Sequence, residues 1–194
     1  FNASMCNQKL IGAQYFNAAW GGNAGIAEEE FASPRDFGGH GTHTPSTSGG
    51  NANVPTTQDA ALFGSVSGIA PRARIAAYKA LWETPSGGSG YNSDLVAAID
   101  QAVADGVDVI NYSVSGTSTN FADPVEIAFL FAADAGVFVA ASAGNSGPTT
   151  STVAHPSPWT TTVAAGTHNR NGAGSVTLGN GMTYSGASFA GRTG

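Results

Sequence analysis

Strand-like and helix-like runs of apolar residues alternate through the middle of the chain. Short continuous apolar runs predict strands, whereas Leu95, Ile99 and Ala102 recur at the spacing of one helix face. The predicted elements are a first strand at 74–79, a helix at 93–106, a largely buried strand at 107–113, a helix at 123–136 and an apolar strand at 137–141. This alternation predicts an α/β fold built on a parallel sheet.

Each predicted helix has residues at both ends that favour starting or ending a helix. Ser93 is placed to cap the first helix through its hydroxyl, and Gly106 is placed to end it. Pro124 stands at the first position of the second helix, where its missing N–H costs nothing, and Gly136 closes that helix. The two helices should therefore be short and well bounded.

The two ends of the chain differ from the middle. The first 39 residues are rich in glycine and asparagine, and the tail carries hairpin signals at 171–172 and 180–181, both Asn-Gly. Neither end has the pattern of a self-contained domain, so we expect one domain.

Composition narrows the possible functions. The 194 residues are 41% hydrophobic and only 10% charged, with a formal net charge of −6, which is typical of a globular protein. The scarcity of lysine and arginine argues against nucleic acid as a partner, because that affinity depends on clustered cations. No apolar run approaches the roughly eighteen residues of a membrane span, and no signal-peptide leader opens the chain, so we expect no membrane partner.

The sharpest local motif is Gly-His-Gly-Thr-His-Thr at 39–44. Its His-x-x-His spacing allows a metal site, but the glutamate that accompanies zinc-protease histidines is missing and no third ligand is evident. A structural pair of histidines is a second alternative. We expect no metal and no cofactor.

A second polar motif, Ala-Ser-Ala-Gly-Asn-Ser-Gly-Pro at 141–148, follows the predicted strand at 137–141. It places the carboxamide of Asn145 at the tip of a strand, where its NH2 can donate to an oxyanion that develops during acyl transfer. Asparagine is also common in ordinary turns, which is the alternative reading of the same position.

Taken together, these motifs resemble the subtilisin-like serine protease family, in particular its large plant and bacterial branch with an inserted protease-associated domain. The matching stretches are 6–13, 33–36 leading into the histidine motif, 69–75, 109–114 and the asparagine turn. The resemblance implies a three-layer subtilisin-like fold, a mainly parallel sheet flanked by helices. It also implies a serine endopeptidase that forms an acyl-enzyme through an Asp-His-Ser triad.

The resemblance assigns roles residue by residue. His40 corresponds to the general base, and Asn145 corresponds to the oxyanion donor. The implied substrate-binding residues form two segments, Ser113, Val114 and Ser115 on one side and Ser142, Ala143 and Gly144 on the other. The first segment would pair with an extended polypeptide substrate through backbone hydrogen bonds. Because both walls are small, we expect a large apolar or aromatic residue before the scissile bond.

The triad aspartate and serine of the family have no clear counterpart. Asp36 lies close to His40 but matches a different family position, and Ser188 imitates the nucleophile motif in a context that resembles the stretch before the inserted domain. We therefore interpret 1–194 as a partial catalytic domain, with 175–194 leading toward the insertion. Such a chain should hydrolyse peptides negligibly on its own.

The resemblance also implies a secreted, extracellular enzyme. Two alternatives of other classes stay open: a non-catalytic module that binds extended peptides along 113–115, and metal-dependent hydrolysis at the histidine motif.

Pro45 departs from the family pattern. It is tolerable if it falls in the first turn of a helix.

Overall fold

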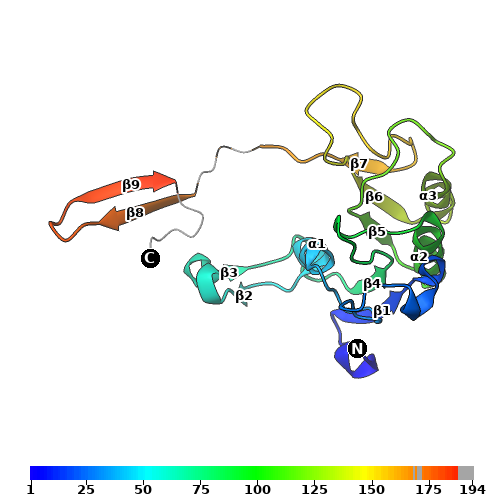
Figure 1. Ribbon diagram of the computed structural model, residues 1–194, viewed down its shortest axis with the longest axis horizontal. Coiled ribbons are helices and arrows are strands. Elements are labelled where there is room, and N and C mark those ends of the chain that lie inside the picture. The colour runs from blue at the N-terminus through cyan, green and yellow to red at the C-terminus, as the bar shows by residue number, and fades with distance from the viewer. Residues whose placement is uncertain (168, 170–171, 188–194) are drawn as a thin grey trace.

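The computed structural model describes residues 1–167, 169 and 172–187 of the chain (Figure 1). Two parallel sheets form its centre: β1 (Leu10–Tyr15) pairs with β4 (Ile75–Lys79), and β5 (Val109–Tyr112) pairs with β6 (Phe138–Ser142), which pairs with β7 (Thr161–Val163). The three α-helices of the described residues are α1 (His40–Gly49), α2 (Asn92–Ala104) and α3 (Pro124–Asp134). The mixed α/β class with parallel strands is confirmed.

The remaining elements are short. They are the 3₁₀ turns η1 (Ala3–Met5), η2 (Ala18–Trp20), η3 (Gly22–Ala24) and η4 (Gln58–Phe63), and two antiparallel hairpins, β2 (Val54–Pro55) with β3 (Ser65–Val66) and β8 (Ala173–Thr177) with β9 (Thr183–Ala187). The predicted hairpin at Asn180–Gly181 is confirmed, with Gly181 at a positive φ of 81° in the turn. Figure 1 shows β8 and β9 apart from the two parallel sheets. The other hairpin signal, at 171–172, falls partly outside the described residues.

The strand predicted as the first of the parallel sheet is preceded by another parallel strand. β4 forms as expected, but β1 precedes it and pairs with it in parallel from Leu10 opposite Ile75 to Tyr15 opposite Lys79. The sequence of β1, Leu-Ile-Gly-Ala-Gln-Tyr, is short and contains a glycine, so its apolar pattern alone did not indicate a strand.

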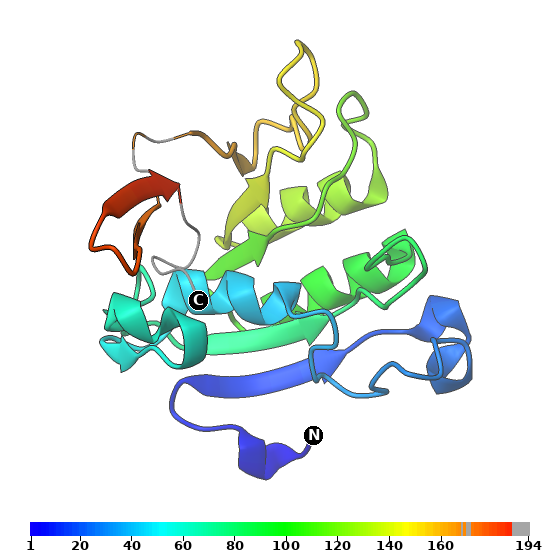
Figure 2. The ribbon, with the colours of Figure 1, turned by 60° about the vertical axis from the view of Figure 1, so that its left-hand side comes forward.

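Successive side chains of β4 contact helices on the two faces of the β1–β4 sheet, so the sheet is the middle of three layers. Ile75 lies against Gly49 of α1, and Lys79 binds the segment that leads into α1. Tyr78 points to the other face, where its hydroxyl donates to Asp105 at the end of α2 at 2.7 Å. Because successive side chains of a strand point to opposite faces, α1 and α2 lie on opposite sides of the β1–β4 sheet, as the two views show (Figures 1 and 2).

The hydrophobic core lies between α2, α3 and the strands beside them. Its buried members are Ala80, Leu95, Ala98, Ile99, Val125, Ala128, Phe129, Ala132, Val137 and Val139. The predicted α2 face is confirmed, since Leu95, Ile99 and Ala102 are all buried. Burying each large aliphatic or aromatic side chain contributes about 1.5–3 kcal/mol, so this contact dominates the stability of the middle of the chain.

Most predicted helix boundaries are confirmed. The Asp123 carboxylate caps α3 by accepting from Val125 N at 2.9 Å, and Pro124 is its first residue. Gly106 and Gly136 follow the ends of α2 and α3 with positive φ values of 76° and 90°. None of the helices within the described ranges is both long and apolar enough to cross a membrane.

Ser93 does not cap α2, so that prediction is wrong. The helix begins one residue earlier, at Asn92, and Ser93 is its second residue. The first turn instead holds Asp94, a buried carboxylate that accepts from Ala19 N at 3.2 Å and lies near the positive end of the helix dipole.

β5 is less buried than its apolar run indicates. Val109 is 57% exposed, and Phe138 of β6 and Val163 of β7 are 54% and 59% exposed. Parallel strands with apolar residues on both faces normally have both faces covered. In the part of the chain that the structure describes, α3 packs against β6 on one side, and these three side chains on the open side are left accessible.

Pro45 lies in the second turn of α1 and not in its first, because it is the sixth residue of that helix. A proline there lacks the N–H that would bond to the carbonyl of Gly41. The hydroxyl of Thr44 donates to the oxygen of Gly41 at 3.1 Å and compensates for the loss. The helix therefore continues past the proline to Gly49.

Replacing Phe129 should destabilise the chain strongly. Its side chain is 0% exposed and packs edge-on against Tyr112 with ring centroids 5.0 Å apart. Phe129→Ala is expected to lower the free energy of unfolding by about 3–5 kcal/mol. Phe131→Ala, on the same helix but 64% exposed, should change it by less than about 0.5 kcal/mol. Urea denaturation followed by circular dichroism would measure both, and equal effects would contradict this placement of the core.

Candidate active site

His40 is the first residue of α1 and is exposed at the carboxyl end of β4. The helix runs antiparallel to β4, because its last residue, Gly49, lies beside Ile75 at the start of the strand. Lys79 at the end of the strand binds the segment that precedes the helix. Figure 2 shows α1 alongside β4 in this orientation. Ligands of open α/β sheets bind beyond the carboxyl ends of the strands, so His40 lies at the end of the sheet suited to a site.

A partly buried ion pair holds the segment before His40. The ammonium of Lys79 donates to Glu30 at 2.8 Å and to the carbonyl of Arg35 at 2.8 Å, and it lies 4.3 Å from the centre of the Trp82 ring. The second carboxylate oxygen of Glu30 accepts from Glu83 N at 3.1 Å. One cation thus joins β4 to the loop that carries the histidine.

Asp36 binds the backbone on both sides of His40. Its two oxygens accept from Gly39 N at 2.9 Å and from Thr42 N at 2.6 Å, so it satisfies amides of the first turn of α1. Burial raises the pKa of Asp36, but the hydrogen bonds from Thr42 and Gly39 outweigh it and the pKa lies below its ordinary value. In the described chain no hydrogen bond joins Asp36 to the ring of His40.

The two predicted substrate-binding segments lie next to each other. The hydroxyl of Ser142 donates to the carbonyl of Val114 at 3.2 Å. A Cβ placed on Gly144, whose φ is +76°, would come within 3.3 Å of the Ser115 hydroxyl. Ala143 is held by Val163, whose carbonyl accepts from Ala143 N at 2.9 Å. The structure therefore brings together the residues that the resemblance places on opposite walls of one pocket.

Ser113 to Ser115, which the resemblance assigns to pairing with an extended substrate, do not form a strand within the described chain. β5 ends at Tyr112, and the chain bends at Val114. Within the described ranges, no backbone hydrogen bond joins Ser113 or Ser115 to another residue. A backbone segment without a partner strand is free to accept one from outside the chain, which is the requirement for binding an extended peptide.

A shallow hollow of about 270 Å³ opens beside these segments. It is lined by Asn111, Tyr112, Ser113, Ala140, Ala141, Ser142 and Val163. Small side chains and backbone form most of the lining, so the hollow places little steric restriction on the side chain of a bound peptide.

Asn145 is exposed in the turn after β6, three residues past the end of the strand. Over the described residues, neither its carboxamide nor the imidazole of His40 makes a hydrogen bond to protein. Both groups are therefore available to a ligand. His43 is likewise exposed, and the residues that the structure describes contain no group of three or more histidine, cysteine, aspartate or glutamate side chains arranged to hold a metal ion.

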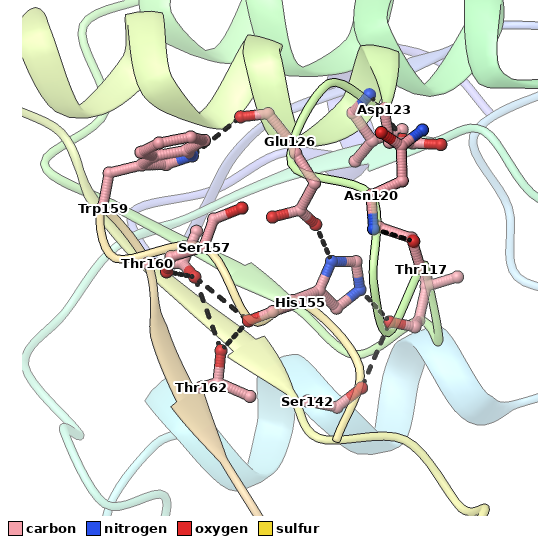
Figure 3. Close-up of polar contacts among 12 residues, drawn as sticks. Thr117, Asn120, Asp123, Glu126, Ser142, His155, Ser157, Trp159, Thr160 and Thr162 are labelled. Atoms are coloured by element: carbon pink, nitrogen blue, oxygen red, sulfur yellow. Dashed lines mark hydrogen bonds and ion pairs between the residues drawn. The ribbon is translucent and has the colours of Figure 1, made fainter. Parts of the chain in front are cut away.

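Two buried polar residues beneath this site were not predicted from the sequence. The ring of His155 and the carboxylate of Glu126 are 1% and 0% exposed and lie 2.5 Å apart (Figure 3). Burial raises the pKa of Tyr112, which packs edge-on against the ring of His155, and the charges of Asp123 and Glu126 raise it further. The available sequence signal was a glutamate on the face of α3 that also carries Phe129, since a carboxylate at a core position needs a buried partner.

The model of the subtilase family matches residues 11–188, which is most of the chain. This chain belongs to the subtilase family. The subtilase is 46% identical over its whole length to subtilisin-like protease SBT1.5 of Arabidopsis thaliana. It is 45% identical over 95% of its length to subtilisin-like protease SBT5.3 of the same plant. The predicted family is therefore confirmed.

The subtilase spans about a quarter of the length of these relatives, 25% of the first and 24% of the second. Among solved structures it is similar to Sphericase, with a TM-score of 0.42, 28% identity and coverage of 72% of this chain and 45% of that one. It is also similar to S41 Psychrophilic Protease, with a TM-score of 0.42, 32% identity and coverage of 70% and 42%. Both scores lie below 0.5, so the fold class rests on the parallel strands and helix layers.

Removing the carboxylate of Asp36 should loosen the start of α1. Asp36→Ala is expected to lower the free energy of unfolding of the subtilase by about 1–2 kcal/mol at pH 7, the usual cost of losing such a cap. Because the folded pKa is depressed, this stabilisation is fully present above the unfolded pKa of about 3.9 and is lost as the pH falls through the folded value.

Urea denaturation at pH 7 and at about pH 2 would measure the effect, since the difference between wild type and variant should shrink at the lower pH. Asp100→Ala, which removes an exposed carboxylate in the middle of α2, is the matched control and should have little effect. A pH-independent cost of Asp36→Ala would contradict the assigned role of its charge.

Proposed function

We propose that this chain supplies the general base and the oxyanion donor of a secreted serine-type endopeptidase. The observation that carries the proposal is the subtilase match over residues 11–188, a stretch that contains the histidine and asparagine motifs. His40 takes the proton of the serine nucleophile and later protonates the leaving amine. Its exposure and lack of a protein partner within the described residues support this role.

The proposed substrates are polypeptides bound in extended form. Backbone groups of Ser113 and Ser115 pair with the peptide, and Ser142, Ala143 and Gly144 form the facing wall of the pocket for the residue before the scissile bond. The unpaired backbone at the first segment and the small residues of the second support this arrangement. The pocket accommodates a large apolar or aromatic residue, and no cofactor takes part.

The triad aspartate and serine are proposed to come from sequence flanking residues 1–194. The coverage of only a quarter of the relatives leaves room for both. Asp36 is better explained as a helix cap, because both its oxygens accept backbone N–H groups. Ser188 lies outside the described residues, and its sequence context argues against it as the nucleophile.

A non-catalytic peptide-binding role is the second candidate. The observation that favours it is that His40 makes no hydrogen bond to a carboxylate in the described chain. Without a carboxylate and a nucleophile the histidine has no acyl-enzyme to form, whereas the cleft at Ser113–Ser115 could still bind peptides.

Labelling with a fluorophosphonate probe separates these candidates. The full-length protein that contains this chain is expected to form a covalent adduct on a serine outside residues 1–194, and His40→Ala should abolish the adduct because the nucleophile is no longer activated. Peptide mapping by mass spectrometry locates the modified serine. An adduct on Ser188 would show that the nucleophile is misassigned, and no adduct on the full-length protein would favour the binding module.

Asn145→Ala should lower kcat of the full-length enzyme by about a hundredfold to a thousandfold with little change in KM. The carboxamide stabilises charge that develops only in the transition state, so its loss affects turnover more than substrate binding. This magnitude is that of the oxyanion asparagine of subtilisin itself and is carried over by family membership. Asn51→Ala, in an exposed loop, is the control. A rise in KM with unchanged kcat would contradict the role.

A further inference from the structure

The buried pair of Glu126 and His155 lies directly beneath the predicted substrate-binding segment. Nδ1 of His155 is 2.5 Å from Oε1 of Glu126 (Figure 3). Its Nε2 is 2.9 Å from the carbonyl oxygen of Val114. Trp159 donates its indole N–H to the backbone oxygen of Glu126 at 2.8 Å. The pair thus links α3, the loop after β6 and the residue between Ser113 and Ser115.

The partners of His155 fix where its protons lie. A carbonyl oxygen only accepts, so Nε2 carries a hydrogen that it donates to Val114. One further proton is shared between Nδ1 and the Glu126 carboxyl, and the pair is neutral as a whole whichever atom holds it. A neutral pair can be buried without an uncompensated charge. The ring therefore acts as a fixed donor to Val114.

The backbone of His155 is strained and its ring is closely packed, which indicates that the ring is kept at this position for its hydrogen bond to Val114. His155 adopts a positive φ of 52°, which is uncommon outside glycine. A Cβ on Gly116 would lie 2.2 Å from Cε1 of the ring, so the backbone two residues after Val114 passes directly against the imidazole. Apolar residues could fill the same volume, but they would not hold the Val114 carbonyl in place.

The Val114 carbonyl is held from two sides. It accepts from His155 and also from the hydroxyl of Ser142, which belongs to the facing wall. A carbonyl oxygen has two lone pairs, so these two donors occupy it and it is not available to a substrate. Ser113 and Ser115, its neighbours, keep their backbone groups free within the described residues.

We propose that His155, oriented by Glu126, is a positioning residue that sets the affinity of the cleft for extended peptides. The inference rests on the proposed function, because it gives a role to the segment that binds substrate. His155 holds the Val114 carbonyl against the body of the protein, which presents Ser113 and Ser115 to the substrate backbone. Its effect falls on peptide binding along the segment and not on the chemical step at His40.

The test uses steady-state kinetics of the full-length protein with two substrates. One is a peptide long enough to pair with Ser113 and Ser115, and the other is a small ester that extends no backbone along them. The double variant Glu126→Leu/His155→Leu removes the donor without leaving a carboxylate buried alone. It is expected to raise KM for the peptide roughly tenfold, the usual worth of one hydrogen bond, with kcat and the ester reaction changed less than about twofold.

Conservative rescue separates positioning from packing. The single variant Glu126→Leu leaves Nδ1 of His155 without a partner to orient the ring, so it should bind the peptide more weakly. In Glu126→Gln the amide can donate to Nδ1 while Nε2 still donates to Val114, so this variant should keep most of the wild-type affinity. Tyr78→Phe is the matched control, because it removes a hydrogen bond to a carboxylate, Asp105, on the opposite end of the core. It should leave KM unchanged. Equal losses for peptide and ester, or no loss for either, would overturn the proposal.

A further variant and a second measurement cover the cases in which the double variant does not fold or the wild type is inactive. If the double variant does not fold, Gly116→Ala displaces the ring with both members of the pair intact, and it should raise the peptide KM in the same way. If the wild type neither labels nor hydrolyses, the proposed function fails, and the affinity for the same peptide, measured by isothermal titration calorimetry, then decides alone. Weaker peptide binding by the double variant than by Tyr78→Phe supports the positioning role, and equal binding overturns it.

Discussion

Parallel pairing of strands is the constraint on which the candidate site depends. In a parallel sheet every strand ends at the same edge, so the residues that follow β5 and β6 must meet there. This is why Ser113 to Ser115 lie beside Ser142 to Gly144, although the whole of α3 separates them in sequence. The same rule, applied to β1 and β4, places the start of α1 at the carboxyl end of β4. No side chain has to be invoked to bring these segments to the edges of their sheets.

Side chains then fix the segments that the sheets bring together. Lys79 ties the loop before α1 to β4, and Asp36 binds the backbone on either side of His40. On the other sheet, His155 and Ser142 both donate to Val114. In each case a buried or half-buried polar group binds main-chain atoms of a loop. Loops that carry functional groups need such anchors, because their own backbone is not held by a ladder.

The sequence was sufficient for the features that depend on local rules. Gly106, Gly136 and Pro124 bound their helices as expected, and Asn180–Gly181 forms its turn, because each of these residues acts through its own backbone preferences. The family could also be recognised from ordered motifs.

The features that could not be predicted from the sequence depend on distant partners. β1 is a strand because β4 is beside it, and the exposed side of Val109 reflects which helices are present to cover it. Glu126 and His155 become interpretable only once α3 and the loop after β6 are seen in contact.

The arrangement at Thr44 and Pro45 has a consequence for how this helix can vary. The hydroxyl at position 44 occupies the carbonyl that the imino acid at position 45 leaves without an amide donor. A change at one position therefore alters what the other costs. Loss of the hydroxyl is harmful only while the proline remains, and once the proline is gone the hydroxyl is dispensable. The two sites are expected to be epistatic, so that substitutions reach them in a preferred order.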